Sequence, residues 1–135
     1  MNNNSSLSHR GQEPEKGILY LVGTPIGNLS DISFRALNIL KNVSLVAAED
    51  TRQTKKIMSK YGFSNKLMSF NQTNATSKIP QIIKLLKNSN AIALVSDAGM
   101  PSICDPGEDL TRAARSNAIE IICIPGASAL LTALI

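Results

Sequence analysis

The sequence has little of several residue types whose chemistry is easy to recognise. Its one histidine, His9, excludes catalytic triads built on imidazole and zinc sites of the HExxH type. Its two cysteines, Cys104 and Cys123, lack CxxC spacing and are too few for a disulfide framework, and the apolar run around Cys123 predicts a place in the core. No apolar run approaches the ~20 residues that span a bilayer, and the amino-terminal region has none suited to a signal peptide. We therefore expect a cytoplasmic protein with no metal site and no membrane segment.

The composition of the 135 residues indicates one globular domain with a polar extension. Hydrophobic residues make up 43% and charged residues 18%, which is enough apolar surface for a folded core. Residues 1–16 are polar and show no periodicity, which predicts a disordered tail. The net charge of +4 is compatible with a nucleic-acid substrate, although Arg52, Lys55, Lys56 and Lys60 at helical spacing are also typical of an ordinary solvated helix face.

After this tail, apolar runs of strand length alternate with amphipathic segments of helix length. Alternation with short connections favours an α/β fold, with a mostly parallel five-stranded sheet flanked by helices. Gly62 suits a left-handed helix end, and Pro80 is expected in the first turn of its helix. The predicted strands are residues 18–22, 44–48, 66–70, 91–95 and 119–124. The predicted helices begin at Ser30 and Asp31, at Thr51, at Ser77, at Asp105 and at Ser128.

Three loops rich in glycine and proline follow three of the predicted strands. Ligands bind at the carboxyl ends of strands in open α/β sheets, so these loops predict one shared pocket. In the first loop, Gly23 and Gly27 have GxxxG spacing, which is neither the dinucleotide-binding GxGxxG pattern nor a phosphate-binding P-loop. By itself this spacing is also typical of a plain tight turn. The loops are residues 23–28, 96–107 and 125–128.

Four acidic residues are predicted at the same edge of the sheet. Asp97 has the chemistry to accept hydrogen bonds from ribose hydroxyls, and it equally suits the cap of a turn. Glu49 and Asp50 have the chemistry to orient a substrate or to accept a proton, and they equally suit ion pairs with Arg52. Asp31 suits either a substrate contact or a helix cap. The residues alone leave both interpretations open for all four.

The order of these motifs resembles that of a known enzyme family. The matching segments are LVGTPIGNLSD (residues 21–31), FRAL (34–37), AEDTR (48–52), VSDAGMP (95–101), DPG (105–107) and IPGASA (124–129). Together they are similar to the ribosomal RNA small subunit methyltransferase I family, within the tetrapyrrole methylase superfamily. The resemblance covers residues 17–135, and an ordered series of motifs of this kind is specific.

The resemblance implies that residues 17–135 form the amino-terminal α/β domain of a two-domain enzyme, whose carboxyl-terminal domain is absent from this chain. Such enzymes use S-adenosyl-L-methionine (SAM) to methylate the 2′-hydroxyl of a cytidine ribose in the 16S ribosomal RNA of the small subunit. They are usually homodimers and need no metal. Because one wall of the cofactor cleft is then missing, we expect this chain alone to bind the cofactor weakly and to turn over little or not at all.

The resemblance also implies roles for individual residues. The implied cofactor-binding residues are Thr24, Pro25, Gly27, Asp97, Ala98, Gly99, Met100, Pro101, Gly126, Ala127 and Ser128. The implied catalytic residues are Glu49 and Asp50, and the implied substrate-binding residues are Asp31, Arg35 and Arg52.

One stretch departs from the family pattern, and two other functions stay open. Residues 71–75 (NQTNA) have neither an acid nor an imidazole where the family usually has both, which leaves no base or ion site there. A methylase of the same fold that acts on a tetrapyrrole or corrin precursor is one alternative, although its first loop would more typically have closely spaced glycines and an acid. A binding or dimerisation module without catalytic activity is the other.

Overall fold

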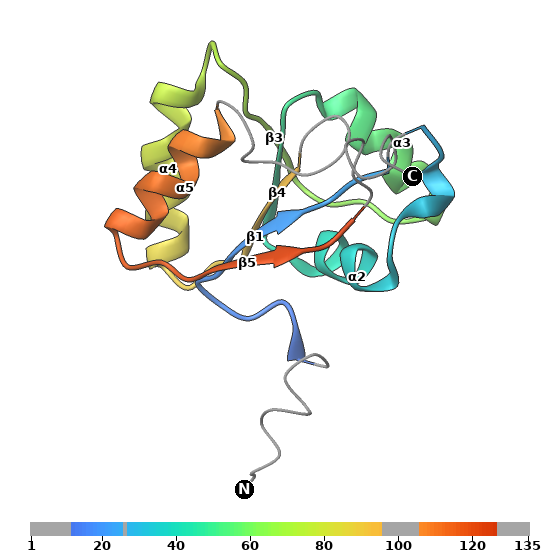
Figure 1. The fold of residues 1–135 in the computed structure, drawn as a ribbon, viewed down its shortest axis with the longest axis horizontal. Coiled ribbons are helices and arrows are strands. Elements are labelled where there is room, and N and C mark those ends of the chain that lie inside the picture. The colour runs from blue at the N-terminus through green and yellow to red at the C-terminus, as the bar shows by residue number, and fades with distance from the viewer. Residues whose placement is uncertain (1–11, 26, 96–105, 127–135) are drawn as a thin grey trace, which may run out of the picture.

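The computed structural model describes residues 12–25, 27–95 and 106–126, which form one sheet with helices on both faces (Figure 1). The strands are β1 (Leu19–Val22), β2 (Leu45–Ala48), β3 (Leu67–Ser69), β4 (Ile92–Val95) and β5 (Ile121–Ile124). They pair in the order β3-β2-β4-β1-β5, and every pair is parallel. The predicted α/β fold with a parallel five-stranded sheet is therefore confirmed.

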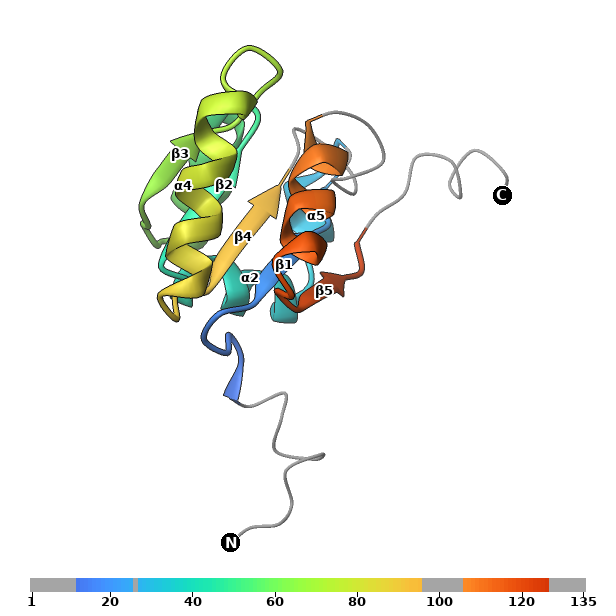
Figure 2. The same cartoon turned by 90° about the vertical axis from the view of Figure 1, so that its left-hand side faces the viewer.

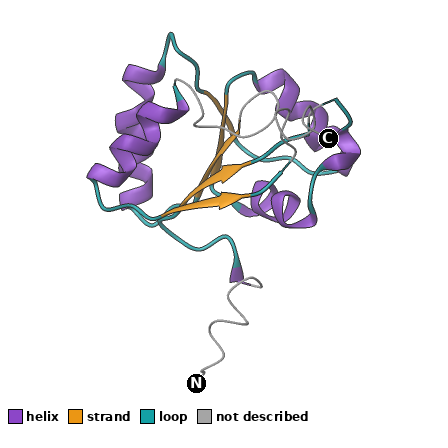
Figure 3. Ribbon diagram, viewed as in Figure 1, coloured by secondary structure: helices purple, strands orange, loops and turns teal. Residues whose placement is uncertain are grey.

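Four α-helices cover the two faces of the sheet in pairs. They are α2 (Phe34–Asn42), α3 (Thr51–Tyr61), α4 (Ala75–Lys87) and α5 (Gly107–Ser116). Helices α2 and α3 lie on one face of the sheet, and α4 and α5 lie on the other. Figure 2 shows the face with α4 and α5, and Figure 3 distinguishes the helices from the strands by colour. The chain moves from β1 to β3 across the sheet and then returns through β4 to β5. Because parallel crossovers are right-handed, this reversal puts the later helices on the opposite face.

Strand side chains alternate between two apolar cores. On one face, Val22 belongs to the cluster that contains Leu40 of α2 and residues of α3. On the other face, Leu21 belongs to the cluster that contains Ile82 of α4 and Leu110 of α5. The central strands β2, β4 and β1 are buried at every position, which is typical of parallel strands covered on both faces.

Cys123 is exposed, so the prediction that it lies in the core is wrong. The apolar run around it does form a strand, but β5 lies at the edge of the sheet. Of its four residues, Ile121 and Ile122 are half-buried and Ile124 alone is fully buried. A continuous apolar run does not distinguish a central strand from an edge strand, because the distinction depends on the strand order.

The first helix begins later than predicted. Ser33 is the N-cap of α2, and its hydroxyl oxygen accepts the backbone N–H of Ala36 at 3.0 Å. The predicted caps Ser30 and Asp31 instead lie in a short 3-10 turn, η2 (Leu29–Asp31), which the side chain of Asn28 caps. Several residues in this segment have side chains that suit a cap, and the geometry of the loop selects among them.

The second helix differs from its prediction at one end and agrees at the other. Asp50, and not Thr51, is the N-cap of α3, since its Oδ1 accepts the backbone N–H of Arg52 at 2.9 Å. Gly62 ends this helix in the predicted left-handed conformation, with φ of 70°. The closing bond runs from the Phe63 N–H to the Met58 carbonyl at 3.0 Å.

The third helix, α4, begins at Ala75, two residues before the predicted Ser77. Two asparagines make a turn directly before it: Asn71 Oδ1 accepts the N–H of Asn74 at 3.2 Å, and Asn74 Oδ1 accepts the N–H of Asn71 at 2.9 Å. Because the helix begins earlier, Pro80 lies inside it and not in its first turn. These asparagines occupy the stretch that departs from the family pattern, and their side chains hold the local turn.

The last described helix, α5, begins at Gly107, directly after Pro106, and Asn117 follows its end as predicted. The Pro106 side chain supplies no cap, and the predicted cap Asp105 lies outside the described residues. The helix predicted from Ser128 also lies outside them.

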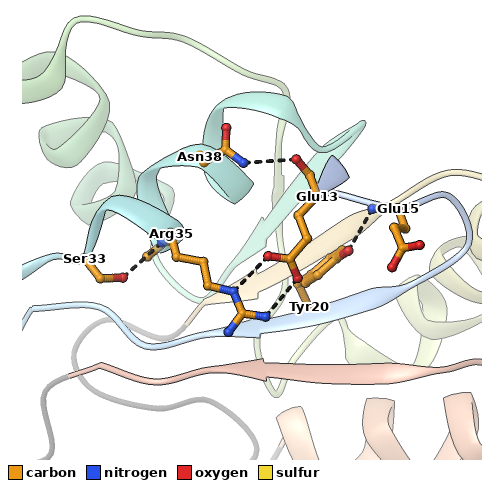
Figure 4. A network of polar contacts seen from close by, with 7 residues as sticks. Glu13, Glu15, Tyr20, Ser33, Arg35 and Asn38 are labelled. Carbon is orange, nitrogen blue, oxygen red and sulfur yellow. Dashed lines mark hydrogen bonds and ion pairs between the residues drawn. The ribbon is translucent and has the colours of Figure 1, made fainter. Parts of the chain in front are cut away.

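Part of the predicted amino-terminal tail is packed against the domain. Glu13 is buried, and its carboxylate accepts two hydrogen bonds from Arg35, one from Nε and one from Nη2, both at 2.8 Å (Figure 4). Its backbone carbonyl accepts a hydrogen bond from Asn38 Nδ2 at 3.0 Å. These contacts hold the segment against α2. The hydrogen bonds that Arg35 donates to Glu13 are the chief reason that the pKa of Arg35 lies above its usual value.

A second contact joins this segment to β1. The N–H of Glu15 donates to the hydroxyl of Tyr20 at 2.7 Å, and burial raises the pKa of that hydroxyl. The prediction that residues 1–16 form a disordered tail is therefore wrong for residues 12–16, whereas residues 1–11 lie outside the described part. Glu13 and Arg35 are 22 residues apart in the sequence, so no local sequence pattern predicts this ion pair.

We expect Glu13→Gln to lower the free energy of unfolding of the chain by about 1–2 kcal/mol, between the values for exposed and buried ion pairs. The Glu13 side chain is 1% exposed and that of Arg35 is 39% exposed, so the pair is partly screened. Urea denaturation measures the difference. Glu108→Gln is the matched control, because Glu108 pairs with Arg112 on the surface of α5, and its loss should not exceed about 0.5 kcal/mol. Equal losses in the two variants would contradict the anchoring role of Glu13.

Candidate functional site

The carboxyl ends of the strands stand level at one edge of the sheet. Val22 of β1 pairs with Val95 of β4 on one side and with Ile124 of β5 on the other. Ala48 of β2 pairs with the same Val95. The chain therefore leaves all four strands at the same edge, and neighbouring exits are separated by about 5 Å, the spacing of paired strands.

The direction of winding reverses between β1 and β4, which are neighbours in the sheet. From β1 the chain crosses to α2 on one face, and from β4 it crosses to α5 on the other face (Figures 1 and 2). In open α/β sheets, ligands bind outside the carboxyl ends of the strands at such a reversal. The candidate site therefore lies over the ends of β1 and β4.

Two of the three predicted loops contact each other at this edge. The N–H of Gly23 donates to the carbonyl of Ile124 at 3.1 Å, which extends the pairing of β1 and β5 beyond the strands. A Cβ atom built on Gly126 would lie 2.8 to 2.9 Å from the backbone atoms of Gly23. The two backbones thus approach more closely than any side chain at position 126 allows, and glycine is required there for steric reasons.

The first loop is buried next to strand β1 and exposed at Gly27. Thr24 and Pro25 are buried, whereas Gly27 is exposed. Gly27 has a φ of 93°, which strains any residue with a Cβ, and the space beside it is open. Gly126 and the preceding Pro125 are exposed as well. Gly27, Pro125 and Gly126 are therefore parts of the two loops that are exposed to a ligand where the strands end.

The remaining residues of the implied cofactor site lie outside the described part of the chain. They are Asp97, Ala98, Gly99, Met100, Pro101, Ala127 and Ser128. The pairing of Val95 with Val22 shows that the second loop departs from the strand next to the first loop. The roles of these seven residues stay predictions.

Glu49 and Asp50 follow β2 and begin α3 at the same edge of the sheet. Asp50 caps the helix and forms an ion pair with Arg52, with 2.9 Å between Oδ2 and Nη2. The hydrogen bonds from Arg52 hold the pKa of Asp50 below its usual value, which makes this carboxylate a weaker base. Glu49 is exposed, and its side chain forms no hydrogen bond or ion pair with the residues that the structure describes. Of the two, Glu49 keeps a carboxylate available to a substrate.

The three residues implied in substrate binding differ in their surroundings. Asp31 is exposed at the end of η2, and the Arg52 side chain is 84% exposed beside Asp50. Arg35 is held by Glu13, which gives it a structural partner, and its contact with substrate stays a prediction. Neither the pairing of Glu13 with Arg35 nor Gly23 is among the predicted site features. The GxxxG spacing pointed to Gly23, whereas nothing local pointed to Glu13.

Within residues 12–25, 27–95 and 106–126, no group of three or more His, Cys, Asp or Glu side chains is placed to hold a metal ion. In the same ranges, no helix is long and apolar enough to cross a membrane.

Comparison with protein families gives a match over nearly the whole chain. The sequence profile described as Tetrapyrrole (Corrin/Porphyrin) Methylases matches residues 18–135. A protein of Streptococcus pyogenes serotype M3 named ribosomal RNA small subunit methyltransferase I is 52% identical over 119 residues, which are 88% of this chain and 42% of that protein. Proteins of the same name from Bacillus subtilis and Thermotoga maritima are 50% and 49% identical, over 96% and 87% of this chain and 44% and 53% of their own lengths. The chain thus spans about half the length of these relatives.

Solved structures with the same fold are more distant in sequence. A crystal structure of uroporphyrin-III-C-methyltransferase from Thermus thermophilus has a TM-score of 0.67 at 20% identity and covers 87% of this chain and 50% of that one. The structure of a cobalt precorrin-4 methyltransferase has a TM-score of 0.70 at 14% identity and covers 87% of this chain and 48% of that one. At these identities the likeness establishes the fold alone.

We expect Gly126→Ala to separate the ends of β1 and β5, because its Cβ would overlap the backbone of Gly23, which has no flexible side chain to move away. The free energy of unfolding should fall by about 1–3 kcal/mol, as for other overpacked sites. The amide of Gly23, which bonds to Ile124, should exchange with solvent faster. Amide hydrogen exchange followed by NMR measures this effect at the residue concerned.

Gly62→Ala is the control for this variant. Gly62 has a φ of +70°, so a Cβ strains the backbone there, but this Cβ would meet nothing within 4 Å and the residue lies at the far end of α3. The variant should destabilise the chain by about 1 kcal/mol and leave the exchange of Gly23 unchanged relative to global stability. Unchanged protection of Gly23 in Gly126→Ala would contradict the contact.

Proposed function

Because this chain belongs to the tetrapyrrole (corrin/porphyrin) methylase family, we propose that it is the amino-terminal domain, residues 17–135, of a SAM-dependent ribosomal RNA methyltransferase. The proposed acceptor is the 2′-hydroxyl of a cytidine ribose in 16S ribosomal RNA of the small subunit, and the full-length enzyme is proposed to be a dimer. Relatives of about 50% identity that bear this name support the substrate class. The tetrapyrrole methyltransferases of known structure share only 14–20% identity.

The observation that most supports this proposal is the contact of the loops after β1 and β5, next to the switch point of the sheet between β1 and β4. The backbone of Gly126 packs against Gly23, and the exposed Gly27 has open space beside it. Small residues and exposed backbone groups suit a flat nucleoside, which needs close approach and hydrogen bonds to main-chain atoms. Gly27 and Gly126 therefore fit the adenosine part of the cofactor, and the buried Thr24 and Pro25 are proposed to support the loop beside them. The loop from Asp97 to Pro101 is proposed as the adjoining wall.

When bound, SAM supplies an electrophilic methyl group on a sulfonium. Transfer of this methyl group from sulfur to the ribose oxygen would leave S-adenosylhomocysteine and would require the 2′-hydroxyl to lose its proton. The chain's task is to align the hydroxyl with the methyl group and to accept that proton. Glu49 is the proposed acceptor, because its carboxylate is exposed at the sheet edge. Asp50 is proposed to position Arg52 and the start of α3.

Methyl transfer from isotopically labelled SAM to isolated small ribosomal subunits tests the proposal. We expect slow transfer in single turnover with the chain in excess, and 2′-O-methylcytidine as the labelled nucleoside after digestion. Calorimetry should show weak binding of SAM, lowered at least about tenfold in Gly126→Ala and unchanged in Gly62→Ala. Transfer to a tetrapyrrole precursor instead of the ribosomal subunit would favour the alternative substrate class. Absence of both SAM binding and transfer would overturn the proposal.

A pair of isosteric variants tests the proton acceptor. We expect Glu49→Gln to lower the single-turnover rate by a factor of about 10² to 10⁴, the usual contribution of a general base, without changing the affinity for SAM. Asp50→Asn is the matched control, because Asn caps a helix as well as Asp does, and its rate should stay within a few-fold of the unmodified chain. If Asp50→Asn shows the larger loss, the assignment of the two carboxylates is wrong.

A further inference from the structure

Charge is divided unevenly along this chain. Between Thr51 and Val95 there is no Asp or Glu, while all charged side chains are basic: Arg52, Lys55, Lys56, Lys60, Lys66, Lys78, Lys84 and Lys87. The segment from Gly107 to Ile124, in contrast, contains Glu108, Asp109 and Glu120 beside two arginines. The sheet order places this uneven distribution in space, because α3, β3 and α4 all lie at the β3 end, away from β5 (Figures 1 and 2).

The lysines of α3 form one exposed face. Lys56 and Lys60 stand four residues apart and Lys55 lies beside them, opposite the buried Ile57 and Met58. We call Lys55, Lys56 and Lys60 the α3 basic face. None of the three forms an ion pair with the carboxylates that the structure describes.

Helix α5 differs from the α3 basic face, because one of its exposed cations is paired with acidic side chains. On α5, Arg112 pairs with Glu108 at 3.2 Å and with Asp109 at 2.9 Å. Such pairs neutralise an exposed cation at little cost. On α3, no acid is available at the corresponding positions, so the positive potential extends into solvent.

The α3 basic face leads away from the candidate site. The helix begins directly after Glu49 and its cap Asp50, at the edge of the sheet where the strands end, and it runs toward the opposite edge. From Arg52 to Lys60 the helix rises about 12 Å, over which one strand of a nucleic acid presents roughly three or four phosphates. A backbone bound along this face would therefore enter the site at Glu49.

Two further lysines continue this surface beyond the end of α3. Lys41, in the last turn of α2, lies over the ring of Phe63, 5.7 Å from its centroid. Lys66 follows Asn65, whose Nδ2 donates to the carbonyls of Leu40 and Val43 at 2.9 Å. These bonds hold the loop that ends α3 against the end of α2, so both lysines border the α3 basic face.

We infer that the α3 basic face is the surface on which the RNA backbone lies next to the modified nucleotide, with Lys55, Lys56 and Lys60 in contact with phosphates. The inference rests on the proposed function, since it names the place of the RNA. The occupant is a polyanion with phosphates at regular spacing, because the face offers three exposed cations that form no ion pair with the described carboxylates, one of which, Lys60, lies 5.8 Å from the centroid of the Tyr61 ring.

Two triple variants test the inference at equal charge. K55Q/K56Q/K60Q removes the α3 basic face, and K78Q/K84Q/K87Q removes three lysines of α4, on the other face of the sheet. Lys and Gln have nearly equal helix propensity, so both variants should fold. Binding of a labelled 16S ribosomal RNA transcript is measured by fluorescence anisotropy at several salt concentrations, and binding of SAM is measured by calorimetry.

We expect the α3 variant to bind the transcript about 10- to 100-fold more weakly near 0.1 M salt, and the slope of log K against log[salt] to fall in magnitude by about 2 to 3. The α4 variant should stay within about threefold of the unmodified chain, and SAM affinity should not change in either. Equal weakening in both variants, unchanged RNA binding in the α3 variant, or no RNA binding by the unmodified chain would overturn the inference.

The same variants separate this inference from the proposed function. Loss of binding to vesicles that contain anionic phosphatidylserine, with RNA binding unchanged, would assign the α3 basic face to a membrane surface and overturn the inference. If RNA binding depends on α3 while the chain neither binds SAM nor transfers a methyl group, the proposed activity fails and the RNA surface stands.

Discussion

The candidate site depends on one steric constraint: the backbones of Gly23 and Gly126 touch where β1 and β5 end. A Cβ at position 126 would lie within 2.9 Å of Gly23, so the approach requires a residue without a side chain. The level register of β1 with β4 and β5 brings the loops to the same edge. Winding in opposite directions from β1 and β4 then separates the helices above them. A close contact of two backbones at the sheet edge, next to strands from which the chain leaves in opposite directions, suits a nucleoside site.

The polar residues around this edge divide between structural and chemical tasks. Asp50 is engaged by Arg52, and this hydrogen bonding, which lowers its pKa, also fixes the first turn of α3. Glu49, one residue earlier, has no such partner among the described side chains. Two adjacent carboxylates can thus take different roles because only one of them is geometrically placed to cap the helix. Glu13 performs a structural task by holding Arg35 and Asn38 of α2.

The distribution of charge indicates from which end of the sheet a polyanion would reach this site. Between Thr51 and Val95, at the β3 end of the sheet, all charged side chains are basic. Helix α3 connects that end to the edge where Glu49 lies. In the proposed function, methyl transfer and the binding of a polyanion use neighbouring but different residues. Loop backbones and one carboxylate are proposed for the first, and exposed lysines for the second. The two tasks make opposite electrostatic demands, since a proton acceptor is weakened by the cations that phosphates require.

The sequence by itself determined the strands, the helices and the parallel α/β class, because these depend on hydrophobic periodicity over a few residues. It also determined the left-handed end at Gly62 and the ordered motifs that pointed to the family. Local signals failed where several candidates competed, as at Ser30, Asp31 and Ser33, or where burial depended on neighbours, as at Cys123 in an edge strand. Only the tertiary structure decided the strand order, the Glu13–Arg35 pair, the contact of Gly23 with Gly126 and the gathering of the basic residues at one end. Each of these joins segments far apart in the chain, and such contacts form only when the whole sheet places both partners together.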